Sequence, residues 1–255
     1  TQANYVSQSF KTISASGPNA AIIHYFPTAE TNRALSINET FLLDSGSHYL
    51  DGTTDITRTL HFGDPNDRQM ECYTRVLKGH IAVATAKFPY KTKGHVLDSF
   101  ARAHLWNVGL DYGHGTGHGI GAYLNVGEGP HSAAVKHNVD DPGLRANMFM
   151  SNEPGYYEKD EFGIRLENIV RVVDSPKFAG FLELDTISFV PFQRKLIETN
   201  LLTKTEVEWL NDYHAKCALL VGNYIMNPDN KYENVGKVMN WLEEQTTPIT
   251  FTCDT

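Results

Sequence analysis

The chain has few cysteines, no excess of positive charge and no long apolar run. Its three cysteines, Cys72, Cys217 and Cys253, lie far apart and form no CxxC pair, which argues against a disulfide framework and favours a reducing, cytoplasmic location. With 22 Lys and Arg against 30 Asp and Glu, the net charge is -8, so neither nucleic acid nor an anionic membrane is expected as a partner. No apolar segment approaches the roughly 20 residues that span a bilayer.

The 255 residues, 41% of them hydrophobic, suffice for one large core or for one core with an appendage. We expect a main domain over residues 1–202 and a helical extension over residues 203–255. The chain starts with Thr1 and enters what looks like mid-domain sequence within a few residues. This start suggests a fragment of a longer protein.

Short apolar runs and amphipathic segments are mixed along the chain. Runs bounded by Gly, Pro and Asp predict strands, and apolar residues at helical spacing predict helices. The predicted strands span about 19–25, 40–50, 56–62, 146–152 and 163–173, and a strand-rich region follows over 182–191. The predicted helices span about 67–86, 94–108, 203–226 and 231–245. Because strands and helices do not alternate strictly, we expect an α+β fold with hairpins rather than a doubly wound parallel sheet.

Two aspartates lie on predicted strands, where acidic residues are disfavoured. A two-residue turn at Asp51-Gly52 would pair Asp55 with His48 and place Asp44 and Asp55 on one side of the hairpin, about 13 Å apart. For both to hold one ion the strand must bend, and Gly46 is the expected place. Alternatively, the aspartates cap turns, or Asp55 pairs with the His48 imidazole.

A second hairpin, centred on Asp160, would place Glu153 directly opposite Glu167. Like charges in opposite positions destabilise a sheet unless a positive group lies between them. Arg165, two residues from Glu167 on the same face, would be one such group, and a divalent cation would be another. Four acidic residues in two hairpins favour the cation.

The segment HGTGHG places His114 and His118 four residues apart. Its glycines disfavour a regular helix and no Glu follows the first histidine, which excludes the zinc-protease helix. Glycines here suggest backbone drawn close to a ligand, with one histidine reaching a metal and the other the substrate. His24, inside an apolar run, stays open between a structural and a functional role.

The candidate ligands offer carboxylate oxygens, one imidazole nitrogen and no thiolate; they are Asp44, Asp55, His118, Glu153 and Glu167. This hard set suits Mn²⁺ and, less specifically, Co²⁺, Fe²⁺ or Zn²⁺. Four carboxylates exceed the need of one ion and suit two metals about 3.5–4 Å apart. We therefore expect two divalent metal ions that activate a bridging water.

Several segments match a known family: GPNAAIIHY, LLDSGSHYLDGTTDITRT, HGTGHGIGAYLNV, EPGYYE, FGIRLENIV, LTKTEVEWLNDYH and WLEEQTTPI. They resemble the creatinase/methionine-aminopeptidase superfamily and, within it, the catalytic domain of cytosolic aminopeptidase P (Xaa-Pro aminopeptidase). The resemblance implies the pita-bread fold with a C-terminal helical extension that contributes to a homodimer. It implies a metal-dependent exopeptidase that releases the N-terminal residue from peptides with proline in second position, by a metal-activated hydroxide.

The resemblance also implies roles for the metal ligands. Asp44 would bind one metal, while Asp55 and Glu167 would bridge the pair. His118 and Glu153 would hold the other metal, and Glu153 would also serve as the catalytic acid/base.

A second group of residues would shape the pocket for proline. The resemblance implies that His24 and His114 line it and help proton transfer. Tyr157 and Arg165 would support the ligands and border the same pocket.

Two departures from the family pattern stand out. The family usually has a histidine in the stretch NVHEGP, where this chain has Gly127, and His131 lies four residues on as a possible substrate-binding replacement. Without a replacement we expect a slow enzyme or one of altered specificity. The family also carries two further N-terminal domains, which are absent from this sequence.

Two rival functions stay open. The first is another enzyme of the same fold, either prolidase, which cleaves Xaa-Pro dipeptides, or methionine aminopeptidase. The second is a catalytically weakened peptide-binding module. The GPNAAIIHY strand and the C-terminal extension favour aminopeptidase P.

Overall fold

The computed structural model describes residues 2–136 and 138–251. Its strands are β1 (Tyr5–Gln8), β2 (Ile13–Ser16), β3 (Thr40–Ser45), β4 (Ser47–Tyr49), β5 (Gly52–Thr53), β6 (Ile56–His61), β7 (Lys87–Pro89), β8 (Gly117–Gly119), β9 (Glu128–Ala133), β10 (Phe149–Asn152), β11 (Gly155–Glu158), β12 (Phe162–Arg165), β13 (Asn168–Asp174) and β14 (Phe181–Thr186). The α-helices are α1 (Asp67–Ala84), α2 (His95–Trp106), α3 (Lys204–Met226) and α4 (Val235–Thr246). Short 3-10 helices are η1 (Gly17–Ala21), η2 (Arg194–Leu196) and η3 (Thr199–Leu201).

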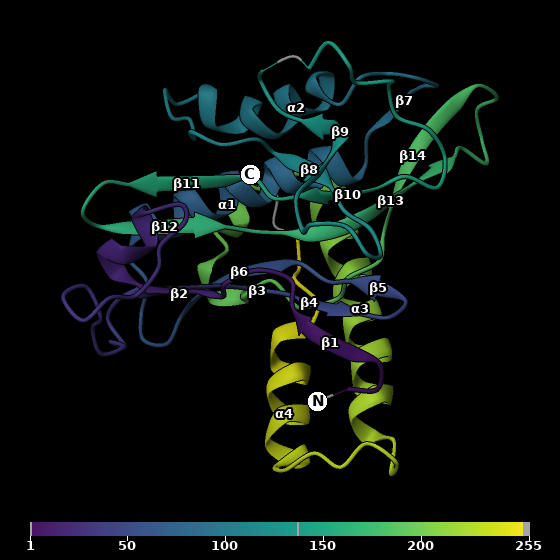
Figure 1. Ribbon diagram of the computed structural model, residues 1–255. Coiled ribbons are helices and arrows are strands. Elements are labelled where there is room, and N and C mark those ends of the chain that lie inside the picture. The colour runs from purple at the N-terminus through teal and green to yellow at the C-terminus, as the bar shows by residue number, and fades with distance from the viewer. Residues whose placement is uncertain (1, 137, 252–255) are drawn as a thin grey trace.

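The strands form antiparallel sheets, which confirms the predicted α+β class. A six-stranded sheet has the order β7-β14-β13-β10-β8-β9, and a three-stranded sheet has the order β2-β3-β6. In Figure 1, α1 and α2 lie on one side of the six-stranded sheet and β2-β3-β6 lies on the other. Two smaller sheets, β1-β4-β5 and β11-β12, extend these layers.

The helices begin where the sequence supplies caps. Asn66 and Gln69 form a capping box at the start of α1, and Thr203 and Glu206 form another at the start of α3. The four helices agree with the predicted segments within about two residues at most ends, and α4 begins later than expected.

The predicted strand over residues 19–25 is wrong. The segment forms η1 and then turns, and Ile22 within it is exposed. Gly17 has φ +54° and Pro18 lacks an N–H donor, so the chain leaves β2 here and cannot continue as a paired strand. The apolar residues of this run divide between core and surface: Ala20 and Tyr25 are buried, whereas Ile22 is exposed.

The first hairpin turns one residue earlier than predicted. His48 pairs with Thr53, not with Asp55, because the two turn residues are Leu50 and Asp51. The expected break at Gly46 is confirmed, since β3 ends before it and β4, which starts after it, pairs with β1 in another sheet. A Cβ at Gly46 would lie 2.0 Å from the Thr54 carbonyl oxygen, so only glycine fits.

The C-terminal helices share a hydrophobic core with the rest of the fold. Val207, Leu210 and Tyr213 of α3 pack in one cluster with Tyr73 and Leu77 of α1. The α3–α4 pair then extends away from the sheets (Figure 1). Residues 252–255 of the predicted extension, Cys253 among them, lie outside the described residues.

Candidate metal centre

The first pair of predicted ligands comes from β3 and the start of β6. Asp44 lies on β3 opposite Thr57, and Asp55 directly precedes β6. Both side chains are buried, with exposed fractions of 7% and 5%. The strand break at Gly46 lets the chain leave the β2-β3-β6 sheet after Asp44 and return to it after Asp55. Both aspartates are therefore buried at the same end of this sheet.

The second pair comes from the hairpin predicted around Asp160. Asn152 pairs with Asn168 on one side of the ligands, and Gly155 pairs with Arg165 on the other. This constant register places Glu153 and Glu167 opposite each other in the gap between the two ladders, as the sequence indicated. Glu167 is 1% exposed.

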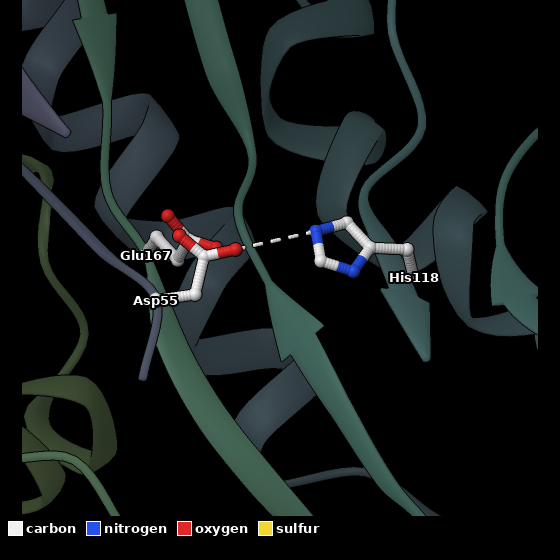
Figure 2. A group of neighbouring side chains, drawn as sticks. All are labelled: Asp55, His118 and Glu167. Carbon is white, nitrogen blue, oxygen red and sulfur yellow. Dashed lines mark ion pairs between the residues drawn. The ribbon is translucent and has the colours of Figure 1, made fainter. Parts of the chain in front are cut away.

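His118 reaches these carboxylates from the short strand β8. Glycines flank it because β8 is tightly enclosed: a Cβ at Gly117 would lie 2.1 Å from the Ser151 carbonyl oxygen. His118 Nε2 lies 3.5 Å from Asp55 Oδ2 and 3.3 Å from Glu153 Oε1. Figure 2 shows the Asp55 and Glu167 carboxylates together, facing the His118 ring.

The residues present fit a divalent cation. Ligand atoms of Asp55, His118 and Glu167 all lie within 4.8 Å of one another. Asp44 Oδ1 and Glu167 Oε1 are buried and lack a hydrogen-bond partner among the described residues. A buried carboxylate oxygen without a donor is costly. A cation among these oxygens would remove that cost, and the oxygen-rich set suits hard metals.

In the metal-free protein, burial favours the protonated form of three of these carboxylates. Burial raises the pKa of Asp44 to about 6 and that of Glu153 to about 7, and it raises the pKa of Glu167 well above its usual value. Repulsion from the neighbouring carboxylates adds to each shift. Burial alone would lower the pKa of His118, but its bond to Asp55 and the Glu153 charge outweigh burial and raise it to about 9. Metal binding must therefore displace protons.

Arg165 serves Asp44 rather than the glutamate pair. Its Nη2 donates to Asp44 Oδ2 at 2.8 Å, its Nη1 donates to the Tyr157 hydroxyl at 2.8 Å, and its Nε donates to the Thr57 hydroxyl. Arg165 forms no ion pair with Glu153 or Glu167 within the described chain. Its proposed place between the two glutamates is therefore wrong, and among the described side chains it is His118 that forms an ion pair with Glu153.

A cavity of about 330 Å³ opens beside the carboxylates, lined by Ile23, His24, Asp44, His114, Gly115, Gly117, His118, Ser132, Ala134, Glu153 and Arg165. His24 lies in a turn at its rim and is exposed, which removes the reading of a buried structural histidine. The cavity thus brings the two predicted pocket histidines beside the candidate ligands.

Hydrogen bonds fix His114 in the cavity wall. Its Nδ1 donates to the Gly115 carbonyl at 2.8 Å, and its Nε2 accepts from the Tyr157 hydroxyl at 2.8 Å. Burial lowers the pKa of His114 to about 4, so the ring is neutral near pH 7. Both ring nitrogens are occupied, and a proton-transfer role for His114 requires one of these bonds to open.

His131 does not line this cavity. Its Nε2 donates to the Phe149 carbonyl at 2.9 Å, which ties the ring to β10. Gly127 lies beside His118, and a Cβ built on it would be 3.7 Å from His118 Cγ in ordinary van der Waals contact. The geometry therefore leaves room for a side chain at Gly127 and gives His131 no route to replace it in this conformation.

Two hydroxyl residues beside the ligands escaped the sequence prediction. Thr57 donates to Glu167 Oε2 at 2.7 Å, and Ser151 donates to Glu153 Oε1 at 3.1 Å while accepting from the His118 N–H. Each lies two residues from a predicted ligand, Asp55 or Glu153. The period of two along a strand was the signal that could have identified them.

Carboxylates from two strand hairpins and one imidazole facing them form a candidate metal centre on a pita-bread fold. The chain belongs to metallopeptidase family M24, which matches residues 1–174, and the C-terminal region of peptidase M24 matches residues 180–249. No helix in the described part of the chain is long and apolar enough to cross a membrane.

Among its relatives, the Xaa-Pro aminopeptidase ApepP of Drosophila melanogaster is 49% identical over 254 residues, covering 98% of this chain and 41% of the relative. Aminopeptidase P1 of Lotus japonicus is 50% identical over 247 residues, covering 94% of this chain and 36% of the relative. This chain thus spans about two fifths of these relatives' length.

Solved structures give a similar result. The X-prolyl aminopeptidase of Caenorhabditis elegans, described as a cytosolic enzyme with a di-nuclear active site, superimposes with a TM-score of 0.90 at 42% identity, over 97% of this chain and 40% of that one. The prolidase of Pyrococcus furiosus superimposes with a TM-score of 0.61 at 28% identity, over 72% of this chain and 50% of that one.

Proposed function

We propose that this chain is the catalytic part of a metal-dependent aminopeptidase that releases the N-terminal residue from peptides whose second residue is proline. The observation that carries the proposal is the convergence of Asp55, His118 and Glu167 within 4.8 Å. Its support is the presence of this group in a chain about half identical to Xaa-Pro aminopeptidases.

The residues that would hold the metals are Asp44, Asp55, His118, Glu153 and Glu167. Two bound divalent ions would polarise the scissile carbonyl and lower the pKa of water. We propose Mn²⁺ as the ion, because the set is rich in oxygen and has no thiolate. Co²⁺, Fe²⁺ and Zn²⁺ are the alternatives.

The chain's own groups would move the proton. Glu153 is the acid/base that the family resemblance implies, and it lines the cavity in which the peptide would bind. The Ser151 hydroxyl donates to its Oε1 and fixes the carboxylate. Glu153 therefore accepts a proton in the first half of the reaction and returns it to the leaving proline nitrogen.

The cavity wall would select the substrate. An Xaa-Pro bond has no N–H and a fixed proline φ, so recognition depends on the shape of the ring more than on an extended backbone. His114, Tyr157 and Arg165 form a hydrogen-bonded wall that gives the cavity a fixed outline. His24 at the rim would contact the proline side of the peptide.

Three features of the wider protein belong to the same proposal. We propose a cytoplasmic location, in keeping with two buried free cysteines. We propose a homodimer to which the C-terminal helices contribute, because Leu219, Leu220 and Trp241 on them are exposed apolar residues. The division into a catalytic domain, 1–202, and a helical extension, 203–255, is part of this proposal.

The test is hydrolysis of Arg-Pro-Pro by the purified chain, read by mass spectrometry with Mn²⁺ and again with chelator. Metal-dependent release of arginine from Arg-Pro-Pro, and none from Arg-Ala-Ala, is the expected result. Cleavage of the dipeptide Arg-Pro with the tripeptide intact would instead identify a prolidase. Peptide binding without cleavage in the metal-loaded protein would identify a binding module.

A further inference from the structure

A second polar network, fully buried, surrounds the backbone of residues 166–168. Its side chains come from three elements far apart in sequence: Arg58 on β6, His80 on α1 and Tyr213 on α3. All three side chains are buried. The network uses none of the predicted site residues' side chains, yet it encloses the main chain of the ligand Glu167.

Arg58 is the centre of this network. Its Nη1 donates to the Glu167 carbonyl oxygen at 2.6 Å. Its Nη2 donates to Asn168 Oδ1 at 2.7 Å and to the Tyr213 hydroxyl at 2.9 Å. The guanidinium group thus joins the ligand's own peptide unit to the next residue and to α3.

Arg58 has no carboxylate partner within the described residues. Its hydrogen bonds go to carbonyl groups, an amide and a hydroxyl, and its guanidinium carbon lies 4.3 Å from the centre of the Phe192 ring. A buried cation without a counter-ion is costly. The carbonyl oxygens of Thr57, Glu167 and Val190, which accept its hydrogen bonds at 2.6–2.8 Å, take the place of a counter-ion.

His80 completes the enclosure on the α1 side. Its Nδ1 donates to the Leu166 carbonyl at 3.1 Å, and the Asn168 amide donates to its Nε2 at 3.2 Å. Residues 166, 167 and 168 are therefore each held by a buried side chain. The segment on either side of Glu167 has no freedom to shift unless this network opens.

Tyr213 links the network to the C-terminal helices. Its hydroxyl accepts from Arg58 and from the Val190 N–H at 3.1 Å, and it lies within donating distance of the Val190 carbonyl and of Asn168 Oδ1. Its ring stacks on Trp209 with a centroid distance of 5.4 Å and an interplanar angle of 6°. Removal of the hydroxyl alone would leave this ring packing in place.

We propose that Tyr213 is a positioning residue for Glu167, so that a helix of the C-terminal region sets the metal affinity of a centre built from the strands. The inference rests on the proposed metal centre. Groups that orient a metal ligand typically change metal affinity by about 10–100-fold when they are removed. Tyr213 acts through Arg58 and Asn168, and it touches neither metal nor substrate.

The test is Tyr213→Phe in the full chain, with the Kd for Mn²⁺ measured by titration calorimetry and the visible absorption spectrum recorded with Co²⁺. We expect the Kd to rise about 10–100-fold and the Co²⁺ bands to shift, because Glu167 is less fixed. The metal-free variant should keep a cooperative unfolding transition, since the ring stacking stays.

Two controls separate positioning from packing. Trp209→Phe weakens the ring stack and keeps the Tyr213 hydroxyl, so it should lower the Tm and leave the Kd unchanged. Tyr224→Phe removes an exposed hydroxyl from the same helix and should change neither. A Tyr213→Phe protein with a lower Tm but the wild-type Kd and Co²⁺ spectrum would overturn the inference.

The same measurements distinguish this inference from the proposed function. If the wild-type chain binds neither Mn²⁺ nor Co²⁺, the metal centre itself is wrong and the inference falls with it. If the wild type binds and Tyr213→Phe binds equally well, only the positioning role is wrong.

Discussion

The metal side and the pocket side of this site rest on two kinds of backbone. The five candidate ligands lie on strands or directly beside them, where the ladders fix the register. His24 and His114 instead lie in a turn and an irregular segment. Arg102 holds the His114 carbonyl at 2.6 Å, and Tyr157 holds its ring. Local strand pairing therefore positions the ligands, whereas long-range contacts position the pocket.

The largest effect should come from removing one charge on the metal side. Asp55→Asn keeps the size of the side chain but removes a charge from the 4.8 Å group. We expect metal affinity and peptidase activity to fall by on the order of 10³-fold or more. Calorimetric titration with Mn²⁺ checks this, with Asp185→Asn in an exposed ion pair on β14 as the matched control. Equal losses in both variants would contradict a specific centre.

A smaller effect should follow from removing the cation that joins the two sides. Arg165→Met leaves Asp44 buried without its partner at 2.8 Å, so we expect about 3–5 kcal/mol less stability in urea at pH 8. The matched variant Arg171→Met breaks an exposed pair with Asp185 and should cost at most about 1 kcal/mol. If the two variants lose similar amounts of unfolding free energy, Arg165 does not link the metal ligands to the pocket.

On the metal side, the stability of the metal-free fold should depend on pH. The pKa values of Asp44 and Glu153 are raised to about 6 and 7, so the metal-free fold is favoured below the unfolded values near 4 and loses stability as pH rises through 6–7. His118, with its pKa raised to about 9, adds stability below about 6.5 that is lost toward pH 9.

Metal binding must replace those protons, so the gain in Tm on adding Mn²⁺ should be small at pH 5.5 and should grow toward pH 8. Between these two pH values, the free energy of unfolding that Mn²⁺ adds should grow by on the order of 3 kcal/mol. Paired thermal scans with Mn²⁺ and with chelator across this range test it. If the difference in Tm with and without Mn²⁺ is the same at every pH, the carboxylates with raised pKa values do not bind the ion.

The smallest expected effect is a gain in activity from a side chain at position 127. Gly127→His would place an imidazole beside His118, where a Cβ meets nothing closer than 3.7 Å. We expect kcat/KM for Arg-Pro-Pro to rise by about 10–10²-fold if the new ring donates to the transition state. Gly236→His, at an open position on α4, serves as the control. No gain would mean that the site does not need a side chain at this position.

The parts of the fold and site that could be predicted from the sequence are those fixed by strand pairing rather than by long-range contacts. The register that places Glu153 opposite Glu167, and the break at Gly46, are local properties of hairpins and were predicted correctly. The turn at Leu50 and Asp51 was placed one residue late, because an Asp-Gly pair is a strong but not decisive turn signal.

The errors lie where distant contacts decide. The run at residues 19–25 contains residues typical of strands, yet the positive φ of Gly17 and the missing N–H donor of Pro18 turn the backbone out of the sheet. The partner of Arg165 is Asp44, which lies 121 residues away in sequence. A contact between residues so far apart in sequence leaves no periodic pattern. The buried Arg58 network could not be predicted for the same reason.

The stack of Trp209 on Tyr213 gives the protein a built-in optical reporter. Trp106 and Trp241 are exposed, whereas Trp209 is partly buried against the hydrophobic core. An external quencher would therefore quench the fluorescence of Trp106 and Trp241 first and leave that of Trp209. Because its ring is in face contact with the residue that binds Arg58, the remaining signal makes the state of Glu167's surroundings readable in real time without a label.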